Sequence, residues 1–192
     1  MRSILNDVNK LAQDYADSGD YDAAYNLLKS IGYSSSEYSP NYSELMRACA
    51  AITSGNYKIA ISCGIVKIIL PEGITSIENN KFKDCEKLVE IVIPESVTSI
   101  GDSAFSGCVG LKKLVLPQSV KHIGIGAFQN CDSLEKLNLP ASLESISLYG
   151  FNSIDGEIHY EGTVEQWNAI RKTGPVSSTD KTIYCSDGKI NP

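Results

Sequence analysis

A spacing of 23 residues recurs through the middle of this chain and limits its possible folds more than any other feature. Five residue types keep this spacing over three or four copies. They are Pro71, Pro94, Pro117 and Pro140; Ile77, Ile100, Ile123 and Ile146; Phe82, Phe105, Phe128 and Phe151; Cys85, Cys108 and Cys131; and Leu88, Leu111 and Leu134. Chance does not align five residue types in this way. The sequence therefore predicts stacked structural units, because a unit of this size cannot bury its own apolar side.

Each repeat contains a short apolar pattern that is typical of a β-strand. The segments are LVEIVIP (88–94), LKKLVLP (111–117) and LEKLNLP (134–140). The last two apolar positions before each proline are two residues apart, which suits a strand with one buried face. The proline ends the strand because it has no N–H to donate to a sheet.

The remainder of each repeat predicts a return to the core. A V-x-x-I pattern at 97–100 is followed by Gly-x-x-Ala-Phe at 101–105, which turns the chain and buries the phenylalanine. Strands of successive coils then pair in parallel, about 4.8 Å apart. A step of 23 residues lies within the range of leucine-rich repeats. We predict an α+β fold, a leucine-rich repeat solenoid with a short parallel β-sheet on its concave face, preceded by an α-helical hairpin domain.

The repeat pattern L-x-x-L-x-IP-x-x-V-x-x-IG-x-x-AF-x-x-C resembles the BspA-like leucine-rich repeats over residues 65–154. The chain departs from the pattern in its first and last copies, where atypical capping residues are expected. These departures are Glu78, Lys81, Ser147, Gly150 and Ile154. Because such repeats occur largely in surface proteins of host-associated bacteria and some protists, the resemblance implies a cell-surface or secreted protein.

The C-terminal part, about 155–192, resembles the segments that close such arrays. We expect Ile158 and Tyr160 to form a last strand, two residues early relative to the repeat. Thr163 is then predicted to cap a short helix, VEQWNAIRK, in which Trp167 and Ile170 face inward together. A cap is needed because the last coil otherwise exposes apolar core and an unpaired strand edge.

The first 60 residues follow a different pattern, so we predict domains at 1–60 and 61–192. Leu5, Val8, Leu11, Ala12 and Tyr15 recur at helical spacing. The segment SGDYDAAYNLL (18–28), which places Ala24 on an apolar face, begins much like SGNYKIAI (54–61), 36 residues further on. Each follows a helix-like run. This region resembles tetratricopeptide-type helical hairpins.

Charge and hydropathy exclude two classes of partner. The net charge is −6, with basic and acidic residues interspersed and no basic stripe, which argues against nucleic acid and anionic membrane surfaces. No apolar run approaches the roughly 18 residues of a membrane span. The start, MRSILNDVNKLAQ, lacks the apolar core of a signal peptide. This leaves a cytoplasmic location, or a piece of a longer protein, as alternatives to the surface.

The cysteines and histidines, which often act as catalytic or metal-binding residues, form no catalytic or metal-binding pattern in this sequence. No CxxC pair occurs, and in-register cysteines have parallel side chains about 4.8 Å apart, whereas a disulfide needs converging ones. We therefore predict Cys85, Cys108 and Cys131 to be reduced and buried. His122 and His159 belong to different coils, without a neighbouring nucleophile pattern. We expect no metal, no cofactor and no enzymatic activity.

The predicted sheet exposes two columns of side chains on its concave face. One column is Lys67, Glu90, Lys113 and Lys136; the other is Ile69, Val92, Val115, Asn138 and His159. The first predicts stacked ion pairs, each worth little. The second is apolar for three rungs, which indicates either a binding surface or simply good strand formers.

These observations lead to one main hypothesis for function and to a ranked set of alternatives. The main hypothesis is a non-catalytic protein-binding or adhesion module of a bacterial surface protein, engaging a host or bacterial protein without nucleic acid or membrane insertion. The first alternative is a structural spacer or scaffold fragment without a ligand, and an enzyme is a distant third. An apolar concave patch free of solvating charge favours binding over the spacer.

Overall fold

The structure is a computed structural model that describes residues 66–147, 149–151, 154–175 and 181–190. It also describes isolated residues of the N-terminal part, namely 10–12, 14, 15, 17, 18, 20, 23, 24 and 27. The chain divides into two compact units, Met1–Ile69 and Leu70–Pro192. The second copy of the predicted helical hairpin, at 54–61, and the predicted boundary at residue 60 lie outside the described residues.

The described positions of the first unit include helical residues. The Asp20 carboxylate accepts a hydrogen bond from the Ala23 N–H at 3.0 Å, and the Asp20 carbonyl accepts one from the Ala24 N–H, so Asp20 caps a helix. Ala12 and Ala24 are fully buried, and the burial of Ala24 agrees with its predicted place on an apolar face. Leu11 is 45% exposed, so not every residue at the predicted helical spacing faces inward. The unit ends with strand β1 (Lys67–Ile69), in which only the central Ile68 is buried.

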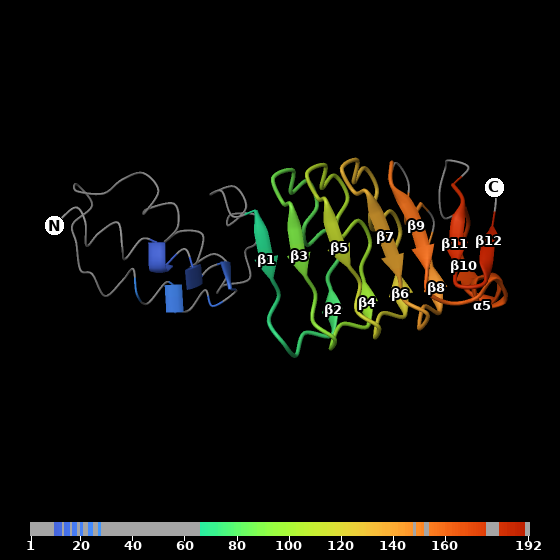
Figure 1. Ribbon diagram of the computed structural model, residues 1–192, viewed down its shortest axis with the longest axis horizontal. Helices are drawn as coiled ribbons and strands as arrows, with labels where there is room; N and C mark the ends of the chain where they lie inside the picture. Colours follow the sequence, from blue (N-terminus) through green and yellow to red (C-terminus); the bar gives the residue numbers. More distant parts are fainter. Residues whose placement is uncertain are drawn as a thin grey trace. The chain divides into compact units, whose positions relative to one another are not determined.

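Two sheets form the framework of the second unit, and Figure 1 shows their strands following one another along the solenoid. The first sheet here contains β3 (Glu90–Val92), β5 (Lys113–Val115), β7 (Lys136–Leu139), β9 (Glu157–Tyr160), β11 (Ile183–Cys185) and β12 (Gly188–Ile190), in that order. The second contains β2 (Ser76–Ile77), β4 (Ser99–Ile100), β6 (His122–Ile123), β8 (Ser145–Ile146) and β10 (Arg171–Lys172). Neighbouring strands are parallel except β11 and β12, which form an antiparallel hairpin.

The register of both sheets reproduces the step of 23 residues. Leu114 lies between Ile91 of the coil before it and Leu137 of the coil after it. At β9 the partner of Leu137 is Ile158, which confirms the predicted shift of two residues at the last repeat strand. The predicted solenoid of parallel strands is therefore confirmed.

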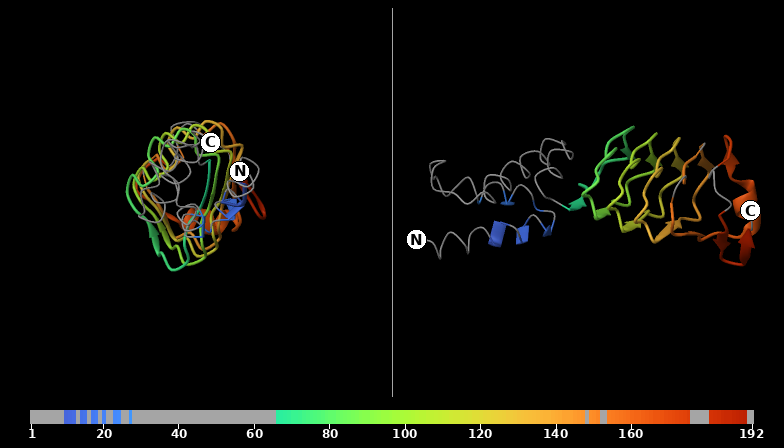
Figure 2. Two further views of the ribbon diagram at one scale, coloured as in Figure 1. Left: turned by 90° about the vertical axis from the view of Figure 1, so that its left-hand side faces the viewer. Right: turned by 90° about the horizontal axis from the view of Figure 1, so that it is seen from above.

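The interior is a ladder of identical side chains. The rings of Phe82, Phe105, Phe128 and Phe151 are fully buried and stack nearly parallel, with centroids 5.2, 5.5 and 6.4 Å apart. The end-on view of Figure 2 shows the coils lying one behind another around this interior. Offset stacking contributes roughly 0.5–1.5 kcal/mol per aromatic pair beyond burial. The predicted phenylalanine core is confirmed.

The second sheet differs from the prediction, which placed only a connection at V-x-x-I. In each coil the serine or histidine before the isoleucine points outward and the isoleucine points inward, so two residues suffice for a strand. The Gly101 N–H donates to the Ile77 carbonyl at 2.8 Å and the Gly124 N–H to the Ile100 carbonyl at 2.9 Å, which extends the ladder.

Glycine follows these strands because the coils approach closely there. The Asn79 side-chain oxygen accepts the Asp102 N–H at 2.8 Å, and the Asp102 carboxylate accepts the Ile125 N–H at 2.7 Å. A Cβ atom on Gly101 would lie 2.5 Å from the Asn79 side-chain oxygen and 2.7 Å from the Asn79 backbone nitrogen. Only glycine fits beside this bond between coils.

The C-terminal cap contains the predicted helix in shortened form. Helix α5 (Val164–Ala169) begins at Thr163 with a complete capping box, and Trp167 and Ile170 are buried, as predicted. The predicted continuation through Arg171 and Lys172 is wrong, because these residues pair with β8 as β10. The Lys172 ammonium donates to the Trp167 carbonyl and lies 5.0 Å from the centre of its ring. Burial lowers the pKa of Lys172.

Candidate functional site

The outward side chains of β3, β5, β7, β9 and β11 form one surface, here called the strand face. The structure places the predicted second column in register on it: Val92 beside Val115, Asn138 beyond Val115, and His159 beyond Asn138. The two predicted members Lys67 and Ile69 lie half-buried on β1, in the first unit. The alternation of buried and exposed residues along each short strand positions all of these side chains.

The apolar part of the strand face consists of two valines. Val92 is 41% exposed and Val115 is 69% exposed, while the leucine and isoleucine between the outward positions are buried. Asn138 and His159 are half-buried. The apolar stretch of the second column therefore covers two rungs in this unit before it becomes polar.

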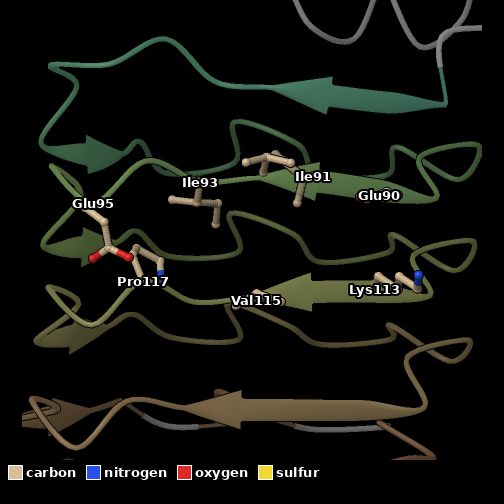
Figure 3. Close-up of a pocket in the computed structure, with 8 residues that line it drawn as sticks. Glu90, Ile91, Ile93, Glu95, Lys113, Val115 and Pro117 are labelled. Atoms are coloured by element: carbon tan, nitrogen blue, oxygen red, sulfur yellow. The ribbon is translucent and has the colours of Figure 1, made fainter. Parts of the chain in front are cut away.

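A hollow of about 260 Å³ lies over these valines. Its residues are Glu90, Ile91, Val92, Ile93, Glu95, Lys113, Val115 and Pro117. Figure 3 shows Val115 near its middle, with Glu95 and Pro117 toward one end and Glu90 and Lys113 toward the other. Four of the predicted site residues thus border one concavity, which is apolar along its length and charged at both ends.

The first column does not form the predicted stacked ion pairs at its centre. Glu90 lies in register with Lys113, but Lys113 and Lys136 take part in no ion pair among the residues that the structure describes. Lys113 and Lys136 directly precede Leu114 and Leu137, which are register partners on β5 and β7. The two exposed lysines are therefore neighbours on adjacent strands. Like charges in this position repel each other.

The far end of the strand face contains two residues that the sequence analysis did not include. Glu157 lies in register with Lys136, and Tyr184 with His159. The His159 and Tyr184 rings stack at 4.8 Å, and His159 Nε2 lies 2.8 Å from a Glu157 carboxylate oxygen. Glu157 could have been found from its place two residues before His159. Tyr184 could not, because the cap breaks the repeat.

The second sheet brings together a pair that the sequence analysis missed. His122 Nδ1 lies 2.9 Å from the Ser145 hydroxyl oxygen, contrary to the expectation of no neighbouring nucleophile, because the serine comes from the next coil. Lys121 and Glu144 form an ion pair at 2.9 Å nearby, and the hydrogen bond from Lys121 lowers the pKa of Glu144. His122 is exposed on its strand and does not border the hollow over the valines.

The cysteines of the ladder are reduced and buried, as predicted. The thiols of Cys108 and Cys131 donate to the carbonyls of Phe82 and Phe105 at 3.0 and 3.2 Å. Burial raises the pKa of both thiols, to about 12 for Cys131. Among the described residues no group of three or more His, Cys, Asp or Glu side chains could hold a metal ion, and no helix could span a membrane.

This architecture, with parallel strands repeated every 23 residues around an apolar ladder, defines a leucine-rich repeat solenoid. Residues 55–167 match the model of the BspA type leucine rich repeat region, in six copies. The chain therefore belongs to this family, as its sequence resemblance implied. The matched region extends beyond the predicted 65–154 at both ends.

Solved structures of leucine-rich repeat proteins are similar to part of the chain. One from Bacteroides ovatus is 32% identical over 52% of this chain and 27% of its own, with a TM-score of 0.47. One from Bacteroides capillosus is 28% identical over 52% of this chain and 79% of its own, with a TM-score of 0.46. A leucine rich cell surface protein from Faecalibacterium prausnitzii is 24% identical over 57% of this chain and 35% of its own, with a TM-score of 0.43. None of the curated proteins matches.

Proposed function

We propose that this chain is a non-catalytic protein-binding module whose strand face contacts a host or bacterial protein. The observation that carries the proposal is the exposure of Val92 and Val115, at 41% and 69%, side by side over a hollow of about 260 Å³. A single exposed valine is an ordinary strand former. Two beside a concavity offer a partner's apolar side chain a place to be buried, and such anchors provide most of the energy in protein interfaces.

The proposed surface comprises Glu90, Val92, Lys113, Val115, Lys136, Asn138 and His159. Lys67 and Ile69, which the sequence analysis assigned to the same two columns, belong to β1 in the first unit. Neighbouring strands bring the seven residues of the larger unit together without any change in the fold.

The size of the strand face limits its affinity. Five strands about 4.8 Å apart span some 20–25 Å and four strand residues about 13 Å, which gives on the order of 300 Å². A standard interface uses roughly 800 Å² per partner. We therefore expect weak binding by one strand face, strengthened where several such faces act together.

A structural spacer is the main alternative to a binding module. A spacer needs no apolar outward patch, whereas Val92 and Val115 provide one. The patch is bounded by charge at Glu95 and Lys113 rather than free of it. This differs from the charge-free patch that the sequence analysis expected of a binding module. An apolar middle with a polar rim is nevertheless the usual arrangement in protein interfaces, and it supports the proposal.

Two finer assignments belong to the same proposal. The family resemblance supports a cell-surface or secreted location, with the cytoplasm as the alternative, and protease treatment of intact source cells distinguishes them. We also propose a tetratricopeptide-like helical N-terminal region. The Asp20 cap and the buried Ala24 support it, and loss of helical circular dichroism in Ala24→Pro tests it.

Selection from a displayed library of random short peptides tests the binding function. The wild-type protein should enrich related sequences, and the enriched peptides should lose binding to a Val92→Ser/Val115→Ser double variant. A His122→Ala variant on the second sheet is the control, and it should retain binding. Failure to enrich any peptide that depends on the two valines would contradict the proposal and leave the spacer.

A further inference from the structure

The size of the hollow on the strand face indicates what kind of group it holds. Pockets for drug-sized ligands have volumes of roughly 300–1,000 Å³ and enclose most of the ligand. The hollow over Val92 and Val115 has about 260 Å³ and lies open on the sheet. This volume suits one apolar side chain presented by a partner chain, with the two valines beneath it.

The lysine pair beside the hollow indicates the charge of that partner. Lys113 and Lys136 are exposed neighbours on β5 and β7, and neither forms an ion pair within the part of the chain that the structure describes. Glu90 on β3 and Glu157 on β9 flank the pair, but between β5 and β7 the two ammonium groups lie side by side and repel each other. A carboxylate placed between them removes this repulsion and gains two attractive contacts.

We propose that the strand face binds a protein segment in which an apolar anchor residue is accompanied by an acidic residue. This inference rests on the proposed function and specifies its partner. The anchor enters the hollow at Val92 and Val115, and the acidic side chain bridges Lys113 and Lys136. The anchor subsite lies between β3 and β5, and the acidic subsite lies between β5 and β7. The two subsites are therefore one strand spacing apart across the sheet and two residues apart along the strands, so their centres are about 8 Å apart. Two residues in extended conformation, at positions i and i+2, span nearly this distance.

The charges around the hollow also fix the orientation of the bound segment. Glu95 lies at the end opposite Lys113, so an acidic residue on that side is repelled. The whole chain is acidic, with a net charge of −6. Glu90 and Glu157 lie in register with Lys113 and Lys136 on their outer sides, so a bound carboxylate is attracted where it lies between the two ammonium groups and is repelled beyond them.

Three synthetic peptides and one double variant test this inference. Each peptide has Gly and Ser flanks; the first carries Phe and Glu two positions apart, the second Phe and Lys, the third Ser and Glu. Binding is followed by nuclear magnetic resonance of the valine methyl groups of the full chain. We expect the Phe/Glu peptide to shift the Val92 and Val115 signals and to bind about five-fold more tightly than the Phe/Lys peptide. The Ser/Glu peptide should bind more weakly still.

Charge reversal provides the decisive comparison. In a Lys113→Glu/Lys136→Glu variant the preference should invert, so that the Phe/Lys peptide binds more tightly, a result that misfolding cannot produce. A Lys87→Glu variant in the turn before β3 should keep the wild-type preference. Equal binding of the two Phe peptides, or a preference that survives the reversal, would overturn the inference. If peptides from the library selection still depended on Val92 and Val115, the proposed binding function would stand although this inference had failed. If no selected peptide depended on the two valines, the proposed function and the inference would both fail.

Discussion

The interior ladder and the strand face belong to the same coils, but the same residue type recurs in the ladder whereas the residue type varies on the strand face. At the phenylalanine position all four coils have the same fully buried residue, with ring centroids 5.2–6.4 Å apart. On the strand face the corresponding column changes from valine to asparagine to histidine. Stacking requires each interior side chain to fit its own copy, whereas an outward side chain has no such partner. The strand face is therefore where this chain can differ from another with the same fold.

The largest expected effect comes from truncation of the ladder. Phe128→Ala should lower the free energy of unfolding by roughly 3–5 kcal/mol, because it removes buried contacts and leaves a cavity. The substitution removes ring stacking at two interfaces between coils, one with Phe105 and one with Phe151. Phe151→Ala, near the last coil, should cost less. Chemical denaturation measures both, and an equal or larger cost for Phe151→Ala would show that the coils do not depend on their neighbours in this way.

A smaller effect is expected where the coils approach each other at glycine. Gly101→Ala places a Cβ atom 2.7 Å from the Asn79 backbone nitrogen, and such overpacking should cost roughly 1–3 kcal/mol. Gly188→Ala on β12 is the matched control. Its new methyl group would lie 3.5 Å from the nearest atom, a Val164 methyl carbon, so denaturation should find it nearly neutral. Similar costs for both variants would mean that the tight approach at Asn79 is not what requires glycine.

The cysteine ladder gives the interior a dependence on alkaline pH. Burial raises the pKa of Cys131 to about 12, whereas an unfolded cysteine ionises near 8.5. Between these pH values the unfolded state releases a proton that the folded state keeps, so the free energy of unfolding falls as pH rises. The fall in the wild type should be steeper than in Cys131→Ala, by up to about 1.4 kcal/mol per pH unit. Chemical denaturation at pH 9–11 measures the free energy of unfolding of both proteins. Equal slopes against pH for the wild type and Cys131→Ala would show that the thiol ionises in the folded state.

The repeat predicts the interior almost completely and the outside only in part. Every phenylalanine and cysteine of the ladder could be placed, because residues 23 apart must meet when coils stack. The strand β10 and the neighbour Tyr184 could not be placed, because they lie in the cap, where the period fails. His122 and Ser145 are 23 residues apart, so the same rule places them side by side. Their hydrogen bond could not be predicted, because it depends on the side-chain conformations of two outward residues.

Val115→Ser tests the central distinction between the two regions most directly. Because Val115 is 69% exposed, its replacement should change the free energy of unfolding by under about 1 kcal/mol, far less than Phe128→Ala. In the same variant the peptide should no longer shift the Val92 methyl signals, and most of the affinity for the Phe/Glu peptide should be lost. Denaturation and peptide titration of this one variant, beside the wild type, provide both numbers. A loss of stability comparable with that of Phe128→Ala, or undiminished peptide binding, would contradict the assignment of the ladder to folding and the strand face to recognition.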